Sequence, residues 1–230
     1  MQKEKCTAIV LAAGRGTRMG TRIQKQYLEL AGKPILYHAL MPFQQAELID
    51  EIVLVVGKGQ EEYCKTEIVE KYHITKVHAI VEGGKERYHS VWNGLQKTDD
   101  GYVFIHDGAR PFVTEDILMR VYDEVQKFKA CVVGMPVKDT IKISDAEGFV
   151  DATPQRSRVW MIQTPQVFET VLIKEAYRRL MEEERSDVTD DAMVAELMLG
   201  VKVKLVEGSY ENIKITTPED LDIGEIFVKK

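Results

Sequence analysis

The sequence predicts an α/β fold in which helices flank a mostly parallel sheet. Short apolar runs rich in valine and isoleucine recur along the chain, and segments with helical periodicity separate most of them. Strands and helices that alternate in this way are typical of a parallel, Rossmann-like sheet. The chain has 230 residues, of which 44% are hydrophobic. It is therefore long enough to bury the core of a single domain over residues 1–230.

The expected strands are the apolar runs, and several of them are apolar on both faces, as a sheet covered by helices requires. They span residues 7–13, 51–57, 76–83, 101–107, 130–137 and 202–208.

Helices are expected over 60–73, 86–98 and 114–130. In the last of these, Thr114 is the expected N-cap, and an apolar stripe consists of Ile117, Val121, Val125 and Phe128. A further helix should begin at Thr217, with Pro218 as its first residue. In the segment 33–45, Pro42 should kink or end the helix that precedes it.

The stretch 138–166 breaks the alternation because it is polar and rich in turn-forming residues. We expect a β-hairpin arm over about residues 138–163 that protrudes from the sheet. A connection of this length usually has a function, such as pairing subunits or covering a site.

Composition excludes several classes of protein. The net charge of −6 argues against nucleic acid as a partner. An apolar run of about 18 residues, which a membrane span would need, is absent from the sequence. The cysteines Cys6, Cys64 and Cys131 are odd in number and widely spaced, so they suggest neither disulfides nor a metal site. We expect a protein of the reducing cytoplasm.

Polar loops rich in glycine, arginine, lysine and threonine follow the predicted strands. Gly14 and Gly16 follow the first strand, "GGKERYHS" the third, "HDGARP" the fourth and "VKDT" the fifth. Each alone could be an ordinary turn. Because ligands of open α/β sheets bind at the carboxyl ends of the strands, the loops together predict a site for an anion.

The first loop fits neither of the two common phosphate-binding motifs. Counted from Gly14, both the P-loop and the dinucleotide fingerprint need a glycine where the chain has Met19. What remains is a turn whose backbone N–H groups at residues 13–16 can bind phosphate oxygens. Arg18 and Lys25 could then neutralise the charge that builds up on the α-phosphorus of a triphosphate under attack.

Asp107 stands at a strand end near the expected phosphates, where a carboxylate is a natural Mg²⁺ ligand. The alternatives are a helix cap or an ion-pair partner of Arg110. The neighbouring His106 is expected to be structural, because an attacking phosphate is already ionised and needs no base.

Several blocks resemble known enzymes. "LAAGRGTRMG" with "KQYLELAGKPIL" resembles the nucleotide-binding signature of sugar and alditol nucleotidyltransferases. "GGKERYHSVWNGL", "VFIHDGARPFV", "PVKDTIK", "RVWMIQTPQVF", "TDDA" and "EGSYENIKITTPEDL" resemble, in that order, the 2-C-methyl-D-erythritol 4-phosphate cytidylyltransferases of the non-mevalonate isoprenoid pathway. The resemblance covers about residues 6–225. The chain differs from the family's usual pattern at two positions. It has Gln24 where proline is common, and Leu11 where the family often has the proline of Pro-Ala-Ala.

The resemblance implies a role for each matching position. The CTP phosphates would be lined by Ala12, Ala13, Gly14 and Gly16, and the transition state would be stabilised by Arg18 and Lys25. Cytosine and ribose would contact Gly83, Gly84 and Ser90, in a loop that Arg87 could brace. Asp107 would hold Mg²⁺ as cofactor. Methylerythritol phosphate would be surrounded by Arg110, Thr140, Arg156, Thr164 and Lys214, with Arg156 and Lys214 on its phosphate.

The implied protein is a cytoplasmic homodimer that transfers CMP from CTP to 2-C-methyl-D-erythritol 4-phosphate. In the family the arm pairs two subunits, so Arg156 would reach the neighbour's site; alternatively it is a solvent-facing arm residue. Two other functions stay open on the sequence. One is a ribitol 5-phosphate cytidylyltransferase, and the other is a non-catalytic nucleotide-binding protein.

Overall fold

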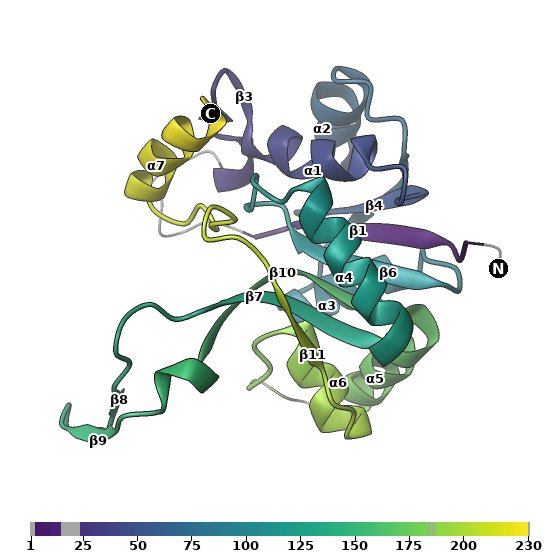
Figure 1. Ribbon diagram of the computed structural model, residues 1–230. Helices are drawn as coiled ribbons and strands as arrows, with labels where there is room; N and C mark the ends of the chain where they lie inside the picture. Colours follow the sequence, from purple (N-terminus) through teal and green to yellow (C-terminus); the bar gives the residue numbers. More distant parts are fainter. Residues whose placement is uncertain (1–2, 15–23, 184, 186, 230) are drawn as a thin grey trace.

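A computed structural model describes residues 3–14, 24–183, 185 and 187–229. Its centre is a seven-stranded sheet in the order β11-β7-β10-β6-β1-β4-β5 (Figure 1). All ladders in this sheet are parallel except the two that β10 makes. The strands are β1 (Cys6–Ala12), β4 (Glu51–Val56), β5 (Val77–Glu82), β6 (Tyr102–Asp107), β7 (Ala130–Pro136), β10 (Trp160–Glu169) and β11 (Lys204–Glu207). The mostly parallel α/β fold and all six expected strands are confirmed.

The seventh strand, β10, is a correction. The sequence assigns residues 160–166 to the arm and its return, but the structure places them antiparallel between β7 and β6. The polar residues Gln163, Thr164 and Gln166 are buried in this strand, and its register with β7 shifts between Ile162 and Gln166. This strand was not predicted because its polar residues and its proline interrupt the apolar run by which a buried strand is recognised.

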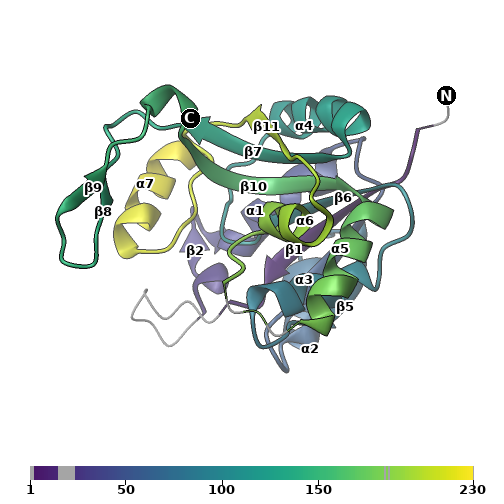
Figure 2. The same cartoon turned by 90° about the horizontal axis from the view of Figure 1, so that it is seen from below.

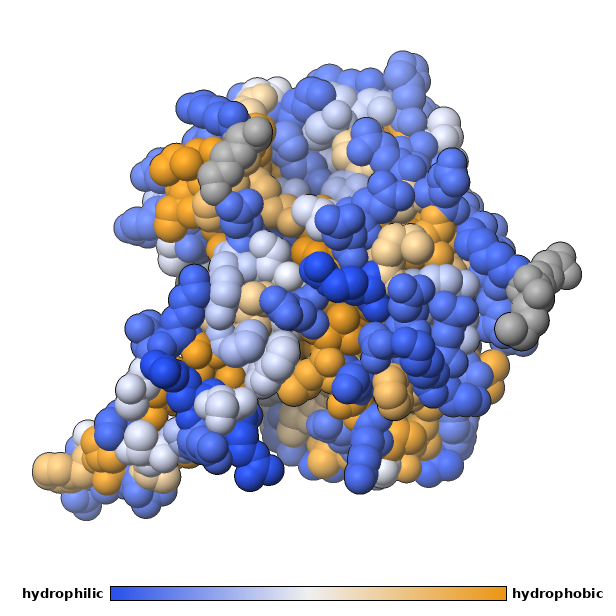
Figure 3. Space-filling model, viewed as in Figure 1, coloured by the Kyte–Doolittle hydropathy of each residue, from blue (hydrophilic) through white to orange (hydrophobic). Residues whose placement is uncertain are grey.

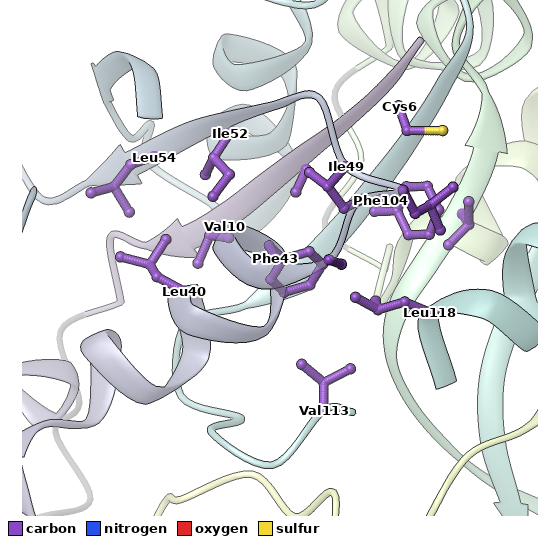
Figure 4. Packing of buried hydrophobic residues seen from close by; sticks show 14 of the residues in the cluster. Cys6, Val10, Leu40, Phe43, Ile49, Ile52, Leu54, Phe104, Val113 and Leu118 are labelled. Atoms are coloured by element: carbon purple, nitrogen blue, oxygen red, sulfur yellow. The ribbon is translucent and has the colours of Figure 1, made fainter. Parts of the chain in front are cut away.

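Helices cover both faces of the sheet. Successive side chains of a strand point to opposite faces, and β1 carries apolar side chains on both, so both faces need to be buried. Val10 packs in a core with α1 and α4, whereas Ile9 packs in a second core with α3, α5 and α6. Figure 4 shows Leu40 and Phe43 of α1 against Val10 in the first core. Burying each such side chain stabilises the fold by about 1.5–3 kcal/mol. The helices of these two layers are α1 (Ile35–Gln45), α3 (Arg87–Leu95), α4 (Glu115–Phe128), α5 (Thr170–Glu182) and α6 (Asp191–Leu199).

The remaining elements surround this centre. They are the helix α2 (Glu61–Cys64), which continues as the π-helix η3 (Lys65–Glu70), the 3₁₀ turns η2 (Lys25–Tyr27) and η4 (Arg156–Arg158), the short ladder β2 (Glu29–Leu30) with β3 (Lys33–Pro34), and the C-terminal helix α7 (Pro218–Val228). No helix among the described residues is both long and apolar enough to cross a membrane.

The two N-caps predicted from the sequence, Thr114 and Thr217, are confirmed. Thr114 caps α4 by accepting a hydrogen bond from the Ile117 amide, and Thr217 caps α7 in the same way. The apolar stripe of α4 is one residue shorter than expected, because Phe128 at its end is exposed. Pro42 does not end α1, which continues to Gln45. The proline lies in the last turn, so it removes little of the helix's hydrogen bonding while the apolar face stays buried.

The arm is a long excursion between β7 and β10 that carries a small hairpin of β8 (Ile143–Ser144) and β9 (Val150–Ala152). It projects away from the sheet and its helices (Figures 1 and 2). Ile143, Phe149 and Val150 near its end are exposed, and apolar residues are visible there among polar ones in Figure 3. The expected protruding hairpin is therefore present.

Candidate active site

A pocket of about 400 Å³ opens where β1, β5 and β6 end at the carboxyl edge of the sheet. This is the edge at which a ligand site was expected. Its lining brings together residues from loops far apart in the sequence: Leu11, Ala12, Ala13, Gly14, Lys25, Gln26, Gly84, Lys85, Glu86, Arg87, Ser90, Asp107, Ala109 and Lys214.

Close packing of two loops forms one wall of the pocket. A Cβ atom on Gly83 would lie 2.3 Å from the Cβ of Ala13, and one on Gly84 would lie 2.3 Å from the Cβ of His89. Neither position has room for a side chain. The Gly84 amide also donates to Ser90 Oγ at 3.1 Å. Gly83 thus lets the β5–α3 loop approach the end of β1, and Gly84, which lines the pocket, lets the loop pack closely on α3.

Lys25 reaches the pocket from the 3₁₀ turn η2, which is tied to the end of β1. The buried Gln26 side chain donates from Nε2 to the Ala12 carbonyl at 2.6 Å. On the other side of the turn, Tyr27 Oη lies 3.1 Å from Cys64 Sγ. These contacts fix the turn relative to the expected phosphate loop. Gln26 was not predicted as a site residue, although it lies in the block "KQYLELAGKPIL", directly after Lys25.

At the floor of the pocket, Asp107 is surrounded by three cationic side chains. Its Oδ2 lies 2.8 Å from Lys214 Nζ and 3.9 Å from Arg110 Nε, and its Oδ1 lies 3.6 Å from Arg87 Nε. Burial alone would raise the pKa of Asp107, but the charges of Arg87, Lys214 and Arg110 together hold that pKa well below its usual range. The carboxylate is therefore ionised, and the cations around it exceed its charge. This is an electrostatic setting for an anionic ligand.

Lys214 and Arg110 are held in place by the chain that follows β11. The Ile215 amide donates to the Ala109 carbonyl at 2.8 Å, which brings Lys214 beside Asp107. Arg110 donates through one terminal nitrogen to the Asn212 carbonyl at 2.8 Å. Asn212 is fully buried, and its side chain donates to the Thr164 carbonyl at 2.9 Å. Asn212 was not predicted as a site residue, because its partners are distant in the chain.

Thr164 and His106 form a buried chain behind Asp107. The Asp107 amide donates to Thr164 Oγ1 at 3.1 Å, and that hydroxyl lies 3.0 Å from His106 Nδ1. His106 Nε2 lies 2.9 Å from the Arg110 carbonyl, so Nε2 carries the proton and Nδ1 accepts from Thr164. Burial lowers the pKa of His106 to about 4. The structural role expected for His106 fits this arrangement, and Thr164 donates its hydroxyl proton within the protein.

Arg87 has a second carboxylate partner. Its terminal nitrogens donate to the two oxygens of Asp191, both at 2.7 Å, and Tyr177 Oη donates to Asp191 Oδ1 at 2.5 Å. Asp191 and Tyr177 are fully buried. Arg87 therefore joins the start of α3 to α5 and α6, so its bracing role extends beyond its own loop.

Other expected site residues lie outside this pocket. Thr140 and Arg156 are exposed residues of the arm, and Arg156 donates to the Lys138 carbonyl at 3.1 Å. Gly16 and Arg18 fall outside the residues that the structure describes. The remaining expected residues either line the pocket or, in the case of Gly83, Arg110 and Thr164, support its wall and floor.

Asp107 is the expected Mg²⁺ ligand, and in the part of the chain that the structure describes few other metal-binding side chains lie near it. Within the described ranges, no group of three or more His, Cys, Asp or Glu side chains could hold a metal ion. Mg²⁺ in nucleotide sites takes one or two carboxylates and completes its shell with phosphate oxygens and water. An ionised Asp107 in a pocket for phosphates fits that pattern, as a single protein ligand for a Mg²⁺ that enters with the triphosphate.

Comparisons with known proteins agree with these observations. The family profile of 2-C-methyl-D-erythritol 4-phosphate cytidylyltransferase matches residues 6–230. The protein of that name from Lachnospira eligens is 52% identical over 97% of this chain and 99% of its own length. Its counterpart from Caldanaerobacter subterraneus is 49% identical over 97% and 99%. The crystal structure of 4-diphosphocytidyl-2C-methyl-D-erythritol synthase from Anaerococcus prevotii, 36% identical, superposes with a TM-score of 0.86 and covers 99% of this chain and 97% of that one. With a pocket rich in cations at the expected edge of the sheet and this likeness along its whole length, the chain belongs to the 2-C-methyl-D-erythritol 4-phosphate cytidylyltransferase family.

Proposed function

We propose that the pocket at the ends of β1, β5 and β6 is where this cytidylyltransferase joins its two substrates. The enzyme transfers CMP from CTP to 2-C-methyl-D-erythritol 4-phosphate, which yields 4-diphosphocytidyl-2-C-methyl-D-erythritol and pyrophosphate. The observation that carries the proposal is the cluster at Asp107: Arg87 is paired with Asp191, yet Lys214 and Arg110 still face Asp107, and Lys25 lines the same pocket. Two phosphorylated substrates that meet in one pocket need such an excess of positive charge.

CTP would occupy the wall formed by the end of β1 and the β5–α3 loop. Backbone N–H groups at Ala13 and Gly14, with Gly16 beyond the described residues, would bind phosphate oxygens. The backbone of Gly84, which lines the pocket, and that of the adjoining Gly83 could contact the edge of the cytosine ring, and Ser90 holds that loop through the Gly84 amide. A side chain at either glycine would collide with Ala13 or His89 and displace this loop.

Lys25 would act on the transition state. Its turn is anchored to the Ala12 carbonyl through Gln26, so the ammonium group is held near the segment that binds the phosphates. In-line attack on the α-phosphorus increases the negative charge on its non-bridging oxygens. Lys25, together with Arg18, would stabilise this charge. Groups that act in this way typically contribute 10²–10³-fold, or about 3–4 kcal/mol, to the rate.

The acceptor would lie over Asp107. Lys214 and Arg110 are the cations beside that carboxylate, so they are suited to a phosphate and to polyol hydroxyls. Thr164 would act mainly by holding the Asp107 backbone. The acceptor phosphate is already ionised at neutral pH, so the reaction needs no general base. His106, neutral and bonded at both ring nitrogens, could not serve as one.

Mg²⁺ remains part of the proposal. When bound, it would neutralise charge on the triphosphate oxygens. Asp107 would supply one carboxylate oxygen to it, and Oδ1 suits this role because Lys214 contacts Oδ2.

The arm supports a homodimer. Its exposed apolar residues Ile143, Phe149 and Val150 could be covered by a second copy of the chain. In such a dimer, Arg156 and Thr140 would complete the acceptor site of the neighbouring subunit. The three buried free cysteines are compatible with a cytoplasmic location, which we also propose.

Pyrophosphate release by the purified protein tests the function. CTP, UTP, GTP and ATP are each combined with 2-C-methyl-D-erythritol 4-phosphate or with ribitol 5-phosphate. We expect rapid release only with CTP and methylerythritol phosphate. Faster release with ribitol 5-phosphate would assign a different acceptor, and no release from any pair would contradict catalysis.

A further inference from the structure

Arg87 lies near two carboxylates, those of Asp191 and Asp107, and it binds Asp191 much more closely. Both of its terminal nitrogens are bonded to Asp191 at 2.7 Å, whereas only Nε faces Asp107, at 3.6 Å. A guanidinium prefers a bidentate pair with one carboxylate. If Asp191 did not bind these two nitrogens, Asp107 would be the neighbouring carboxylate that they could bind instead.

Three features favour the pair with Asp191. Its carboxylate is fully buried and accepts from Tyr177 Oη at 2.5 Å. It is the first residue of α6, directly after the N-cap Asp190, where the helix dipole stabilises a negative charge. The start of α6 is itself fixed to the sheet, because Gln166 of β10 donates to Asp190 at 3.0 Å and accepts from the Ala192 amide at 2.8 Å. Asp191 is therefore a rigid acceptor.

We propose that Asp191, supported by Tyr177, is a positioning residue that holds the two terminal nitrogens of Arg87 away from Asp107 and so keeps Oδ1 of Asp107 available to the ligands of the pocket. The inference rests on the proposed function of that pocket. Asp191 lies outside the pocket lining and touches no substrate in this scheme. It acts through the orientation of Arg87, across the face of the sheet on which α3, α5 and α6 pack (Figure 2).

The test uses Asp191→Asn, which keeps the shape of the side chain and removes its charge. We expect kcat/KM for methylerythritol phosphate to fall by about 10- to 100-fold, because Arg87 turns onto Asp107 and a displaced group at a reaction site has effects of that size. CTP binding measured by calorimetry without Mg²⁺ should stay within about threefold of the wild type, because Asp107 Oδ1 then takes no part in it and the glycine wall is untouched. Glu175→Gln on α5 is the matched control. It removes an exposed carboxylate of the same sign and should leave both values unchanged.

A second substitution separates positioning from stability. In the Asp191→Asn background, Arg87→Met removes the group that would cover Asp107, so acceptor kcat/KM should rise at least about threefold above the single variant. All measurements are made at a temperature at which circular dichroism shows each variant folded. Wild-type kinetics in folded Asp191→Asn, or no recovery in the double variant, would overturn the proposal.

Two further arms keep the result interpretable. If Asp191→Asn does not fold, Asp191→Glu retains the charge but displaces the fork, and unchanged acceptor kinetics in it would equally overturn the proposal. A wild-type protein without turnover on CTP and methylerythritol phosphate would refute the proposed function instead, a result that is distinct from either outcome of the variants.

Discussion

The buried, neutral His106 should make the folded protein unstable in a defined range of acid pH. Burial lowers the pKa of this imidazole to about 4, from an ordinary value of 6.5. Below pH 6.5 the unfolded chain therefore gains a proton that the folded chain does not take up until about pH 4. The free energy of unfolding should fall across that window and this contribution should level off below it.

The size of the effect follows from the shift in the pKa. A difference of about 2.5 pKa units, at about 1.36 kcal/mol each, corresponds to a loss of about 3 kcal/mol between pH 7 and pH 4. The free energy of unfolding of a domain is usually about 5–15 kcal/mol, so this loss is a substantial part of it. The ring has no exposed surface, so solvent does little to weaken the effect.

Urea unfolding at intervals from pH 4 to pH 8 measures it, with His106→Gln as the comparison. The amide can still donate to the Arg110 carbonyl but does not titrate. The wild type should lose about 3 kcal/mol more than the variant over this range. His38, whose pKa burial also lowers, contributes equally to both proteins and cancels. Equal losses in the two proteins, or a His106 resonance that titrates near pH 6.5, would refute the reasoning.

Three substitutions test the proposed roles of single residues, two at the pocket and one on the arm. Lys25→Ala should lower kcat about 10²–10³-fold in a protein that is still folded, because it removes charge stabilisation from the transition state; near-normal turnover would rule out that role. Gly83→Ala places a Cβ 2.3 Å from the Cβ of Ala13, so the KM for CTP should rise at least about tenfold, and adding Ala13→Gly should restore part of the affinity. Failure of that rescue would mean that the contact with Ala13 is not the cause, and would leave Ser90 Oγ, 2.9 Å from the same Cβ, as the clashing atom. Arg156→Ala should impair use of the acceptor while CTP binding is kept, and mixed dimers with Lys25→Ala should regain activity if the arm reaches across subunits. Mixed dimers as inactive as the parents would place Arg156 outside the neighbour's site.

Much of the fold could be predicted because its strands are continuous apolar runs. β1 and β6 are buried on both faces, so each reads as an apolar segment in the sequence. β10 could not be recognised in this way. Its middle consists of Gln163, Thr164, Pro165 and Gln166, and these polar side chains bond to partners that only the folded chain supplies.

The location of the site was predictable for a similar reason. A polar residue directly after a buried strand must lie at the edge of the sheet, and Asp107 is such a residue. Its surroundings were not predictable from spacing, because Arg87 and Asp191 are 104 positions apart. Asp191 belongs to the recognised block "TDDA", but that block reads equally well as an ordinary helix start. Asn212 and Gln26 likewise depend on contacts with distant backbone.

The central claim is that the protein positions and neutralises its substrates while the acceptor phosphate attacks the α-phosphorus directly. The stereochemistry at that phosphorus tests the claim, with a single diastereomer of CTP that carries sulfur on the α-phosphorus and methylerythritol phosphate as acceptor. One direct displacement predicts inversion of configuration in the product, as read by ³¹P NMR. Retention would require a covalent intermediate on the protein and would contradict the account.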